Sequence, residues 1–424
     1  MPNAFSKEER VAFEDILEGF QDALVLSRNV SVYNTDQTMM ERTNNVIWRP
    51  EPYVMQSFSG TDMTSNFKDA TQLSIPATIG FNRSVPWVLT ATELRDALQE
   101  GRLGDSAKQK LASDINVAIN NVAALQGTLV VKRTTAAAGF DDVAQCDAIM
   151  NETGVQQYDR YLALSTRDYN GMANNLSALS RSFGNPKSNN AYERAYVGPV
   201  SGFETFKMDY ALRKAAAAGG ASITISTLDA AVNYYTPKAT STAGTGETNN
   251  VDNRYQTVTV SSTTSVAAGD AFTIANVNNV HAITKQDTGQ LKTFRVISVT
   301  NATTMVISPP IISNQVANDA SAQYQNCVVN TKSATASIVW LNTVSAPVNV
   351  FWQKDALEIL PGRYAVPADA GAAVMRGTTD QGIELVMTKQ YDINTMRTKY
   401  RLDTLYGVVN KQPEMSGIML FSQT

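Results

Sequence analysis

The stretch DSAKQKLASDINVAINNVAALQG, residues 105–127, decides how the rest of the chain is interpreted. Its apolar residues recur at helical spacing and share one face: Leu111, Ile115, Ala118, Ile119, Val122 and Leu125. Gly127 is placed to end this helix, because glycine readily adopts the left-handed backbone of a C-cap. At 1.5 Å per residue, a helix over 105–126 is about 33 Å long. The sequence therefore predicts a long rigid element in the first third of the chain.

The residues immediately before this helix predict a shorter, interrupted one. Thr90 and Glu93 have capping-box spacing, and a helical pattern begins at Leu94. Gly101 and Gly104 then predict a break, because glycine is unfavourable inside a helix.

The N-terminal residues predict a first amphipathic helix. Ser6 and Glu9 form another capping-box pattern. The apolar stripe that follows consists of Phe13, Ile16, Leu17, Phe20 and Leu24. This stripe must be buried, either on the helix's own domain or on a neighbouring chain.

Residues 38–90 are typical of extended structure, because Pro50, Pro52, Pro76 and Pro86 exclude helix through most of the segment. Strand-forming residues flank a polar middle at 59–71, which predicts a long two-stranded hairpin with a polar tip. Such a hairpin is only marginally stable alone. It therefore implies support from another chain or another domain.

A change in composition near Ile223 predicts an inserted domain. Residues 223–344 are rich in Thr, Ser, Val and Asn and poor in charge, and period-2 runs alternate with turn clusters. This pattern is typical of a small antiparallel barrel or sandwich. Residues 241–250 are rich in Gly, Thr and Asn, and we expect them to project into solvent. Mixed helices and strands are predicted on both sides, with strands at 129–131, 161–164, 348–352 and 391–406, helices at 141–150 and 167–182, and a short helical turn at 355–359.

Composition limits the chemistry. The 424 residues carry 35 basic and 39 acidic side chains, so no basic excess marks a nucleic-acid binder. The two cysteines, Cys146 and Cys327, exclude a disulfide scaffold or a zinc ribbon. The single histidine, His281, cannot form a two-histidine metal site, and we interpret it as a structural loop or strand residue. No catalytic, cofactor or metal residues are predicted, and no apolar run approaches the length of a membrane span.

Several stretches, in order along the chain, resemble the major coat protein of lambdoid short-tailed phages of enteric bacteria. They are NNVIWRP at 44–50, ELRD at 93–96, KLA at 110–112 with LQGTLV at 125–130, VDNRY at 251–255 with TVT at 257–259, NVFW at 349–352 and LYGV at 405–408. The ordered set is spread over nearly the whole chain. The resemblance implies an α+β capsid fold of the Hong Kong-97 type with an inserted antiparallel β-barrel domain.

Five parts follow from that resemblance. They are an N-terminal arm at 1–35, a peripheral domain at 36–131 with an extended loop at about 50–86 and a spine helix at about 105–126, the first part of an axial domain at 132–222, the inserted barrel at 223–345 with a projecting loop at about 241–254, and the second part of the axial domain with a return to the peripheral domain at 346–424. The family's projecting loop is charge-rich. Here residues 241–245 are uncharged, so salt bridges and backbone or Asn contacts both remain open for this loop.

The function implied is that of a major capsid protein that builds an icosahedral precursor from hexamers and pentamers and matures around double-stranded DNA. The implied partners are a scaffolding protein, a portal protein and a host chaperonin, with assembly in the bacterial cytoplasm, no sequence-specific DNA contact and no membrane. We predict intersubunit or scaffold contacts at Lys7, Arg10, Phe13, Phe20, Asp62, Lys68, Asp69, Glu247, Asp252 and Arg254. Two alternatives are a carboxylate-based enzyme with a β-barrel binding insert, and a phage tail or adhesin protein.

Overall fold

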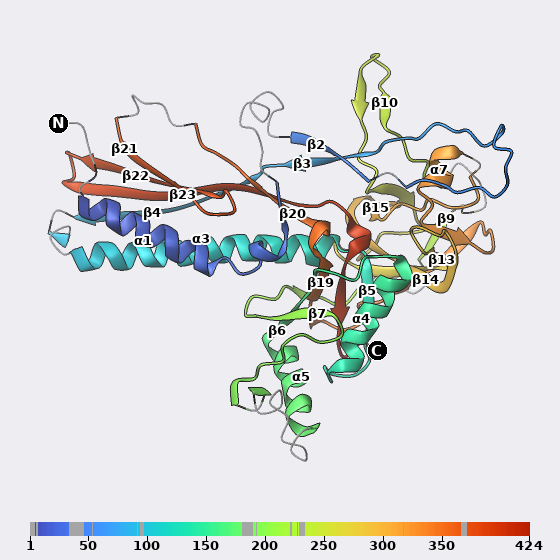
Figure 1. Cartoon of the computed structure of the whole chain (residues 1–424), viewed down its shortest axis with the longest axis horizontal. Helices are drawn as coiled ribbons and strands as arrows, with labels where there is room; N and C mark the ends of the chain where they lie inside the picture. The colour runs from blue at the N-terminus through green and yellow to red at the C-terminus, as the bar shows by residue number, and fades with distance from the viewer. Residues whose placement is uncertain are drawn as a thin grey trace. The chain divides into compact units, whose positions relative to one another are not determined.

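The computed structural model describes the chain in the ranges 5, 7–33, 46–52, 54–90, 92–93, 97–179, 190–191, 193–220, 223–226, 228, 234–316, 318–365 and 371–424 (Figure 1). The chain forms two compact units. The first contains Met1–Ile47, Ala77–Asn120 and Leu357–Val409, and the second contains Trp48–Pro76, Asn121–Ala356 and Asn410–Thr424. The division into five parts is finer than this and stays a prediction.

The first unit is built on one sheet, ordered β1-β20-β23-β22-β21, with β4 also paired to β23. Its strands are β1 (Ser31–Val32), β4 (Phe81–Thr90), β20 (Leu357–Pro361), β21 (Ala373–Thr378), β22 (Glu384–Asp392) and β23 (Arg397–Asn410). Strands β4 and β23 pair along the full length of β4, from Phe81 opposite Tyr406 to Thr90 opposite Arg397. Stacked rings reinforce this ladder, with centroids 5.3 Å apart for Phe81 and Tyr406 and 5.6 Å apart for Trp87 and Tyr400.

The hairpin predicted within 38–90 is confirmed where β2 (Val46–Pro50) pairs with β3 (Ser74–Thr78), but it is wrong for the end of the second arm, from Phe81 onward. Strand β4 pairs with β23, near the end of the chain, rather than with residues near 50. The true hairpin is short and consists of β2 and β3. The predicted helical turn at 355–359 is also shorter, because a 3-10 helix at Lys354–Ala356 leads directly into β20.

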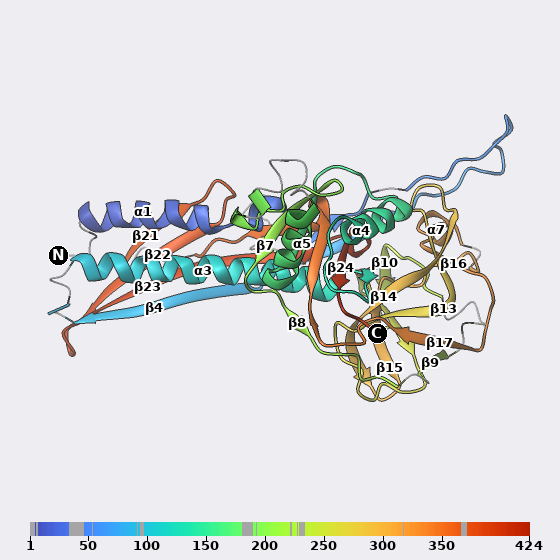
Figure 2. The ribbon, with the colours of Figure 1, turned by 90° about the horizontal axis from the view of Figure 1, so that it is seen from below.

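Two helices cover one face of the first unit's sheet (Figures 1 and 2). Helix α1 (Lys7–Ala23) lies beside helix α3 (Ala97–Gln126). The predicted break at Gly101 and Gly104 is wrong, because α3 is one helix of 30 residues, about 45 Å long. Gly104 serves close packing instead: a Cβ at this position would lie 2.5 Å from Ile16 Cδ1.

The second unit contains a mixed sheet ordered β5-β24-β19-β6-β7. Its strands are β5 (Leu129–Lys132), β6 (Arg160–Ser165), β7 (Phe203–Met208), β19 (Asn349–Gln353) and β24 (Ser416–Leu420), and its helices are α4 (Phe140–Thr153) and α5 (Thr166–Leu179). Pairing is parallel for β5 with β24 and for β6 with β7. All residues of β6, β19 and β24 are buried, which fits strands covered on both faces.

The second unit also contains the inserted antiparallel sheet, ordered β12-β15-β14-β13-β17-β9 with β16 paired to β13. The strands are β9 (Thr224–Ser226), β12 (Gln256–Thr259), β13 (Ala271–Val280), β14 (Asp287–Asn301), β15 (Thr304–Ser308), β16 (Cys327–Val329) and β17 (Thr335–Trp340). The first and last strands meet, because Ile225 bridges Val260 and Ser261 N donates to Thr224 O at 2.9 Å. The sheet closes on itself, so the expected barrel is confirmed. Phe272 lies at its centre, with ring contacts of 5.7 Å to Phe294 and 5.6 Å to Trp340.

We predict that Gly417→Ala destabilises the mixed sheet. A Cβ at this position would lie 2.4 Å from Leu129 O and from Phe351 Cζ, and neither the strand nor the buried ring has room to move. Thermal unfolding of the free subunit should show a loss of roughly 1–3 kcal/mol. Gly244→Ala is the control, because nothing lies within 4 Å of its Cβ position. Equal stability of the two variants would contradict this packing argument.

Candidate assembly surfaces

A long segment connects β2 to β3, residues 51–73, and most of its described residues are exposed (Figure 1). Its described residues form no helix or strand. Glu51 N donates to Leu73 O at 2.9 Å at the base, and Asn66 N donates to Met63 O at 2.9 Å near the tip. Three of its large apolar side chains are exposed, by 73% for Met55, 42% for Phe58 and 86% for Phe67. We call residues 51–73 the extended loop.

Three of the predicted contact residues lie in the extended loop. Asp62 accepts hydrogen bonds from Thr64 N and Oγ1 at 3.0 and 2.6 Å, and these bonds lower the pKa of its carboxyl. Lys68 forms an ion pair of 2.8 Å with Asp319. Asp69 is exposed. All three are therefore on the surface of their own unit.

The predicted residues of the arm helix separate into two pairs. Lys7 and Arg10 are exposed, whereas Phe13 and Phe20 are buried in the core of the first unit. Phe13 packs against β21, where a Cβ at Gly377 would lie 3.1 Å from Phe13 Cε1. Phe13 and Phe20 are thus covered within their own chain, whereas Lys7 and Arg10 face outward together with Glu14 and Glu18.

The predicted projecting loop is a hairpin of β10 (Thr240–Thr242) and β11 (Thr248–Asn250), and every residue from 241 to 250 is exposed. Glu247 lies in this exposed part. Asp252 and Arg254 lie at its root and pair with each other, with guanidinium–carboxylate distances of 2.9 and 2.7 Å. Arg254 also donates to Asn410 O at 2.8 Å and is buried. These two residues bind within the chain.

The root of the hairpin adjoins the base of the extended loop. Ser74 and Asp252 form a parallel β-bridge, and the carboxylates of Asp252 and Glu51 both interact with Arg254. The pKa of Glu51 is raised to about 7: burial is the main cause, Arg254 opposes it, and the carboxylates of Glu414 and Asp252 add to it. Glu51 therefore titrates near neutral pH in the folded subunit.

We predict that Glu51→Gln changes how stability depends on pH. Because the pKa of Glu51 is higher in the folded subunit than in the unfolded chain, its contribution is fully present below about pH 4.5 and is lost as pH rises through 7. The variant should gain roughly 2 kcal/mol over the wild type between pH 4 and pH 8, a value discounted for the partial exposure of Glu51. Urea unfolding at both pH values measures this, and parallel curves for the two proteins would refute it.

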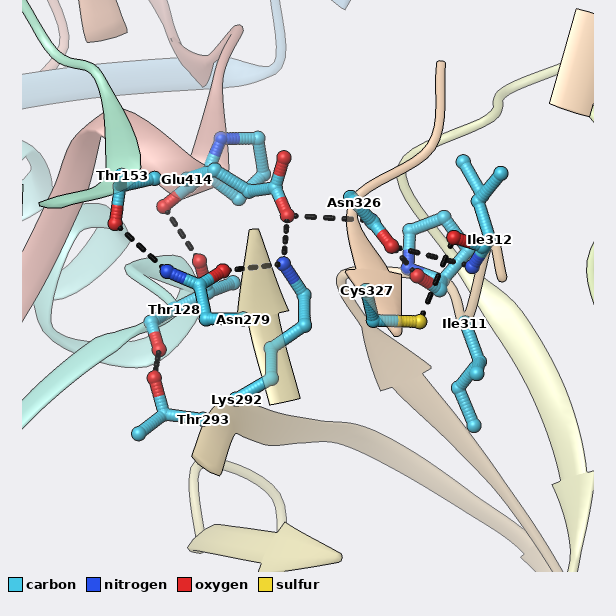
Figure 3. A network of polar contacts seen from close by, with 12 residues as sticks. Thr128, Thr153, Asn279, Lys292, Thr293, Ile311, Ile312, Asn326, Cys327 and Glu414 are labelled. Atoms are coloured by element: carbon cyan, nitrogen blue, oxygen red, sulfur yellow. Dashed lines mark hydrogen bonds and ion pairs between the residues drawn. The ribbon is translucent and has the colours of Figure 1, made fainter. Parts of the chain in front are cut away.

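A polar network on strand β14 connects the inserted barrel with the mixed sheet (Figure 3). The ammonium of Lys292 is buried and forms an ion pair with Glu414, which follows β23 in the chain. Asn326 Nδ2 donates to the same Glu414 oxygen at 3.2 Å, and Asn279 Nδ2 donates to Thr153 Oγ1 at 3.1 Å. The network thus ties barrel strands to helix α4 and to the segment before β24.

A second buried cation on β14 reaches the end of the long helix. Arg295 Nη2 donates to Ala124 O at 2.6 Å, one of the last carbonyls of α3. Such carbonyls have no partner inside the helix, and a cation there complements the helix dipole. Sequence analysis did not single out Lys292, Arg295 or Glu414. The available signal was two cations three residues apart within a run of strand-forming residues.

We predict that Glu414→Gln destabilises the subunit, because Lys292 stays buried after losing its anionic partner. The loss should be about 1–3 kcal/mol, since Glu414 is 35% exposed and part of the ion pair is screened by solvent. The double variant Lys292→Met with Glu414→Gln should recover much of it, because neither charge remains. Exposed Glu204→Gln is the control. A double variant less stable than Glu414→Gln alone would contradict this account.

The single histidine and the two cysteines make contacts within the chain. His281 Nδ1 accepts backbone hydrogen bonds from Ile283 and Thr284, both at 3.3 Å. Cys146 and Cys327 are buried, and burial raises the pKa of both thiols. In the described ranges, no group of three or more His, Cys, Asp or Glu side chains could hold a metal ion. None of the helices in those ranges is long and apolar enough to span a membrane.

The chain belongs to the P22 coat protein family: the family described as "P22 coat protein - gene protein 5" matches residues 1–422. It is therefore a phage major capsid protein, and membership carries with it the Hong Kong-97-type fold implied by the sequence resemblance. Neither the enzyme alternative nor the tail or adhesin alternative has support from this match.

Solved structures similar to the chain include proteins of several phages. One, from Mycobacterium phage Che8, shares 9% identity over 93% of this chain and 90% of its own, with a TM-score of 0.44. The capsid structure of Cyanophage P-SCSP1u shares 12% identity over 93% and 86%, with a TM-score of 0.42. The CUS-3 coat protein I-domain is 39% identical over 29% of this chain and 98% of its own, with a TM-score of 0.21.

Proposed function

We propose that this capsid protein assembles with a scaffolding protein into an icosahedral precursor of hexamers and pentamers, which matures around packaged double-stranded DNA. The observation that carries the proposal is the extended loop, which exposes Met55, Phe58 and Phe67 far from any regular strand pairing of its own. A soluble subunit gains nothing from that exposure. A second copy of the chain, docked against the loop, would remove these side chains from water.

The energy available suits a shell. Full burial of one such side chain stabilises by about 1.5–3 kcal/mol, so one loop contributes a contact of moderate strength. Closure of a shell multiplies such contacts, because each later contact forms at high effective concentration. Contacts of moderate strength also allow a misplaced subunit to leave before closure.

The β10–β11 hairpin supplies a second kind of contact. Its side chains are exposed and, apart from Glu247, uncharged over 241–250, so its contacts with a neighbouring subunit rest on backbone groups and on Thr and Asn side chains. A two-stranded ribbon leaves unpaired N–H and C=O groups along its edges. Asp252 and Arg254 hold the root of the hairpin in place rather than reaching the neighbour themselves.

Surface charge supports the proposed contacts with the scaffolding protein and with DNA. Lys7 and Arg10 offer an exposed basic pair that fits an acidic segment of a scaffolding protein. A net charge of −4 lets the inner surface enclose DNA without gripping its phosphates. Folding with a host chaperonin, assembly in the bacterial cytoplasm, contact with a portal protein and absence of catalysis complete the proposal.

The test is the triple substitution of Met55, Phe58 and Phe67 by Ser. We expect soluble subunits with wild-type circular dichroism that fail to form shells with the scaffolding protein, because the loop no longer gains from burial. Sedimentation and negative-stain microscopy measure the outcome. Tyr158→Ser and Ile283→Ser are matched controls, since these side chains are 55% and 71% exposed in the same unit. Normal shells from the triple variant would refute the role of the loop.

A further inference from the structure

The returning limb of the extended loop, residues 68–73, is held by a short helix of the inserted domain, α7 (Asp319–Gln323). Thr71 N donates to Gln323 Oε1 at 3.2 Å, and Tyr324 Oη donates to Thr71 O at 2.8 Å. Both backbone groups of one loop residue are thus bound by consecutive residues at the end of α7. Three residues earlier, Lys68 pairs with Asp319 at the start of the same helix.

The helix is a firm support for these contacts. Asn318 caps it, with Oδ1 accepting from Ala320 N at 2.9 Å. Ala320, Ser321 and Gln323 are buried, so α7 is packed into the inserted domain. Leu73, where the limb reaches β3, is only 2% exposed. The limb is therefore fixed at both ends, and the Phe67 side chain lies immediately beyond the fixed part.

We infer that α7 is a latch that sets the direction of the extended loop in the free subunit and so prepares it for docking on a second copy. Ordering a flexible loop costs conformational entropy on association. Because α7 already orders residues 68–73 when the subunit folds, their conformational entropy is not lost on association. Only residues 54–67 then become ordered at the interface. The inserted domain thus acts in assembly as well as in its own folding.

This inference rests on the proposed function of the loop, but the latch itself can be observed without assembly. Amide hydrogen exchange of the isolated full-length subunit measures it, because Thr71 N–H exchanges only when its bond to Gln323 opens. Tyr324→Phe removes the hydroxyl that holds Thr71 O. The matched control is Tyr234→Phe, which also loses a hydroxyl bound to a backbone carbonyl, that of Leu228, in the same inserted domain.

In the wild type we expect slow exchange at Thr71 and fast exchange at 54–62. Tyr324→Phe should speed exchange at 68–73 by about twofold to tenfold, which is the range for one hydrogen bond, and should slow shell formation by a similar factor. Tyr234→Phe should leave both unchanged. A second, independent variant swaps the surface charges: Lys68→Asp and Asp319→Lys should each loosen the limb, and the two together should restore it.

Each other outcome is decisive. Unprotected exchange at Thr71 in the wild type overturns the latch, whatever the assembly result. If Tyr324→Phe speeds exchange at residues 68–73 but leaves shell formation unchanged, the claim that α7 prepares the loop for docking is wrong. Equal effects of Tyr234→Phe and Tyr324→Phe overturn it too, since the cause is then loss of domain stability. If the triple Ser variant of Met55, Phe58 and Phe67 forms normal shells, the proposed role of the loop in assembly is wrong. The exchange experiment still tests whether α7 holds residues 68–73.

Discussion

Two buried cations on strand β14 connect the inserted barrel with the elements before and after it in the chain, the end of α3 and the segment that leads into β24. Lys292 forms an ion pair with Glu414 within a network of amide and hydroxyl groups (Figure 3). Arg295 donates to the carbonyl of Ala124 near the end of α3. A buried charge is costly unless it is paired. Few positions of the barrel keep both cations paired, so these contacts restrict where the barrel can lie. Lys292, Arg295 and their partners therefore fix the position of the barrel, although such buried pairs add little net stability.

That constraint bears on the extended loop. The base of the loop reaches the root of the β10–β11 hairpin through Ser74 and Asp252, and its returning limb reaches α7. Both supports belong to the inserted domain. A barrel held in one position therefore fixes the exposed hairpin and the exposed loop together, and the contact geometry of a shell depends on such fixed directions.

Buried charged residues and exposed apolar residues have different roles in this chain. Its buried ionisable groups hold parts of the chain together: Arg254 interacts with Asp252 and Glu51 at the base of the loop, and the pKa of Glu51 is raised to about 7. The extended loop exposes Phe67 and Met55, which are the side chains that the proposed contact with a second copy would bury. Subunit stability and association thus depend on different residues. Substitutions at the loop tip should affect shell formation, and substitutions in β14 should affect the stability of the subunit.

The sequence by itself determined the local elements whose signals lie within a few residues. The helix at 105–126, the barrel strands after Ile223, the exposed stretch at 241–250 and the family resemblance were all readable in this way, because periodicity, turn residues and ordered motifs are local. The tertiary structure alone decided the long-range pairings. Strand β4 pairs with β23, some 300 positions later, and Gly104 continues a helix because Ile16 lies against it. The buried partners of Lys292 and Arg295 belong to the same class, because Glu414 and Ala124 lie more than 100 positions away and electrostatic pairing depends on distance in space.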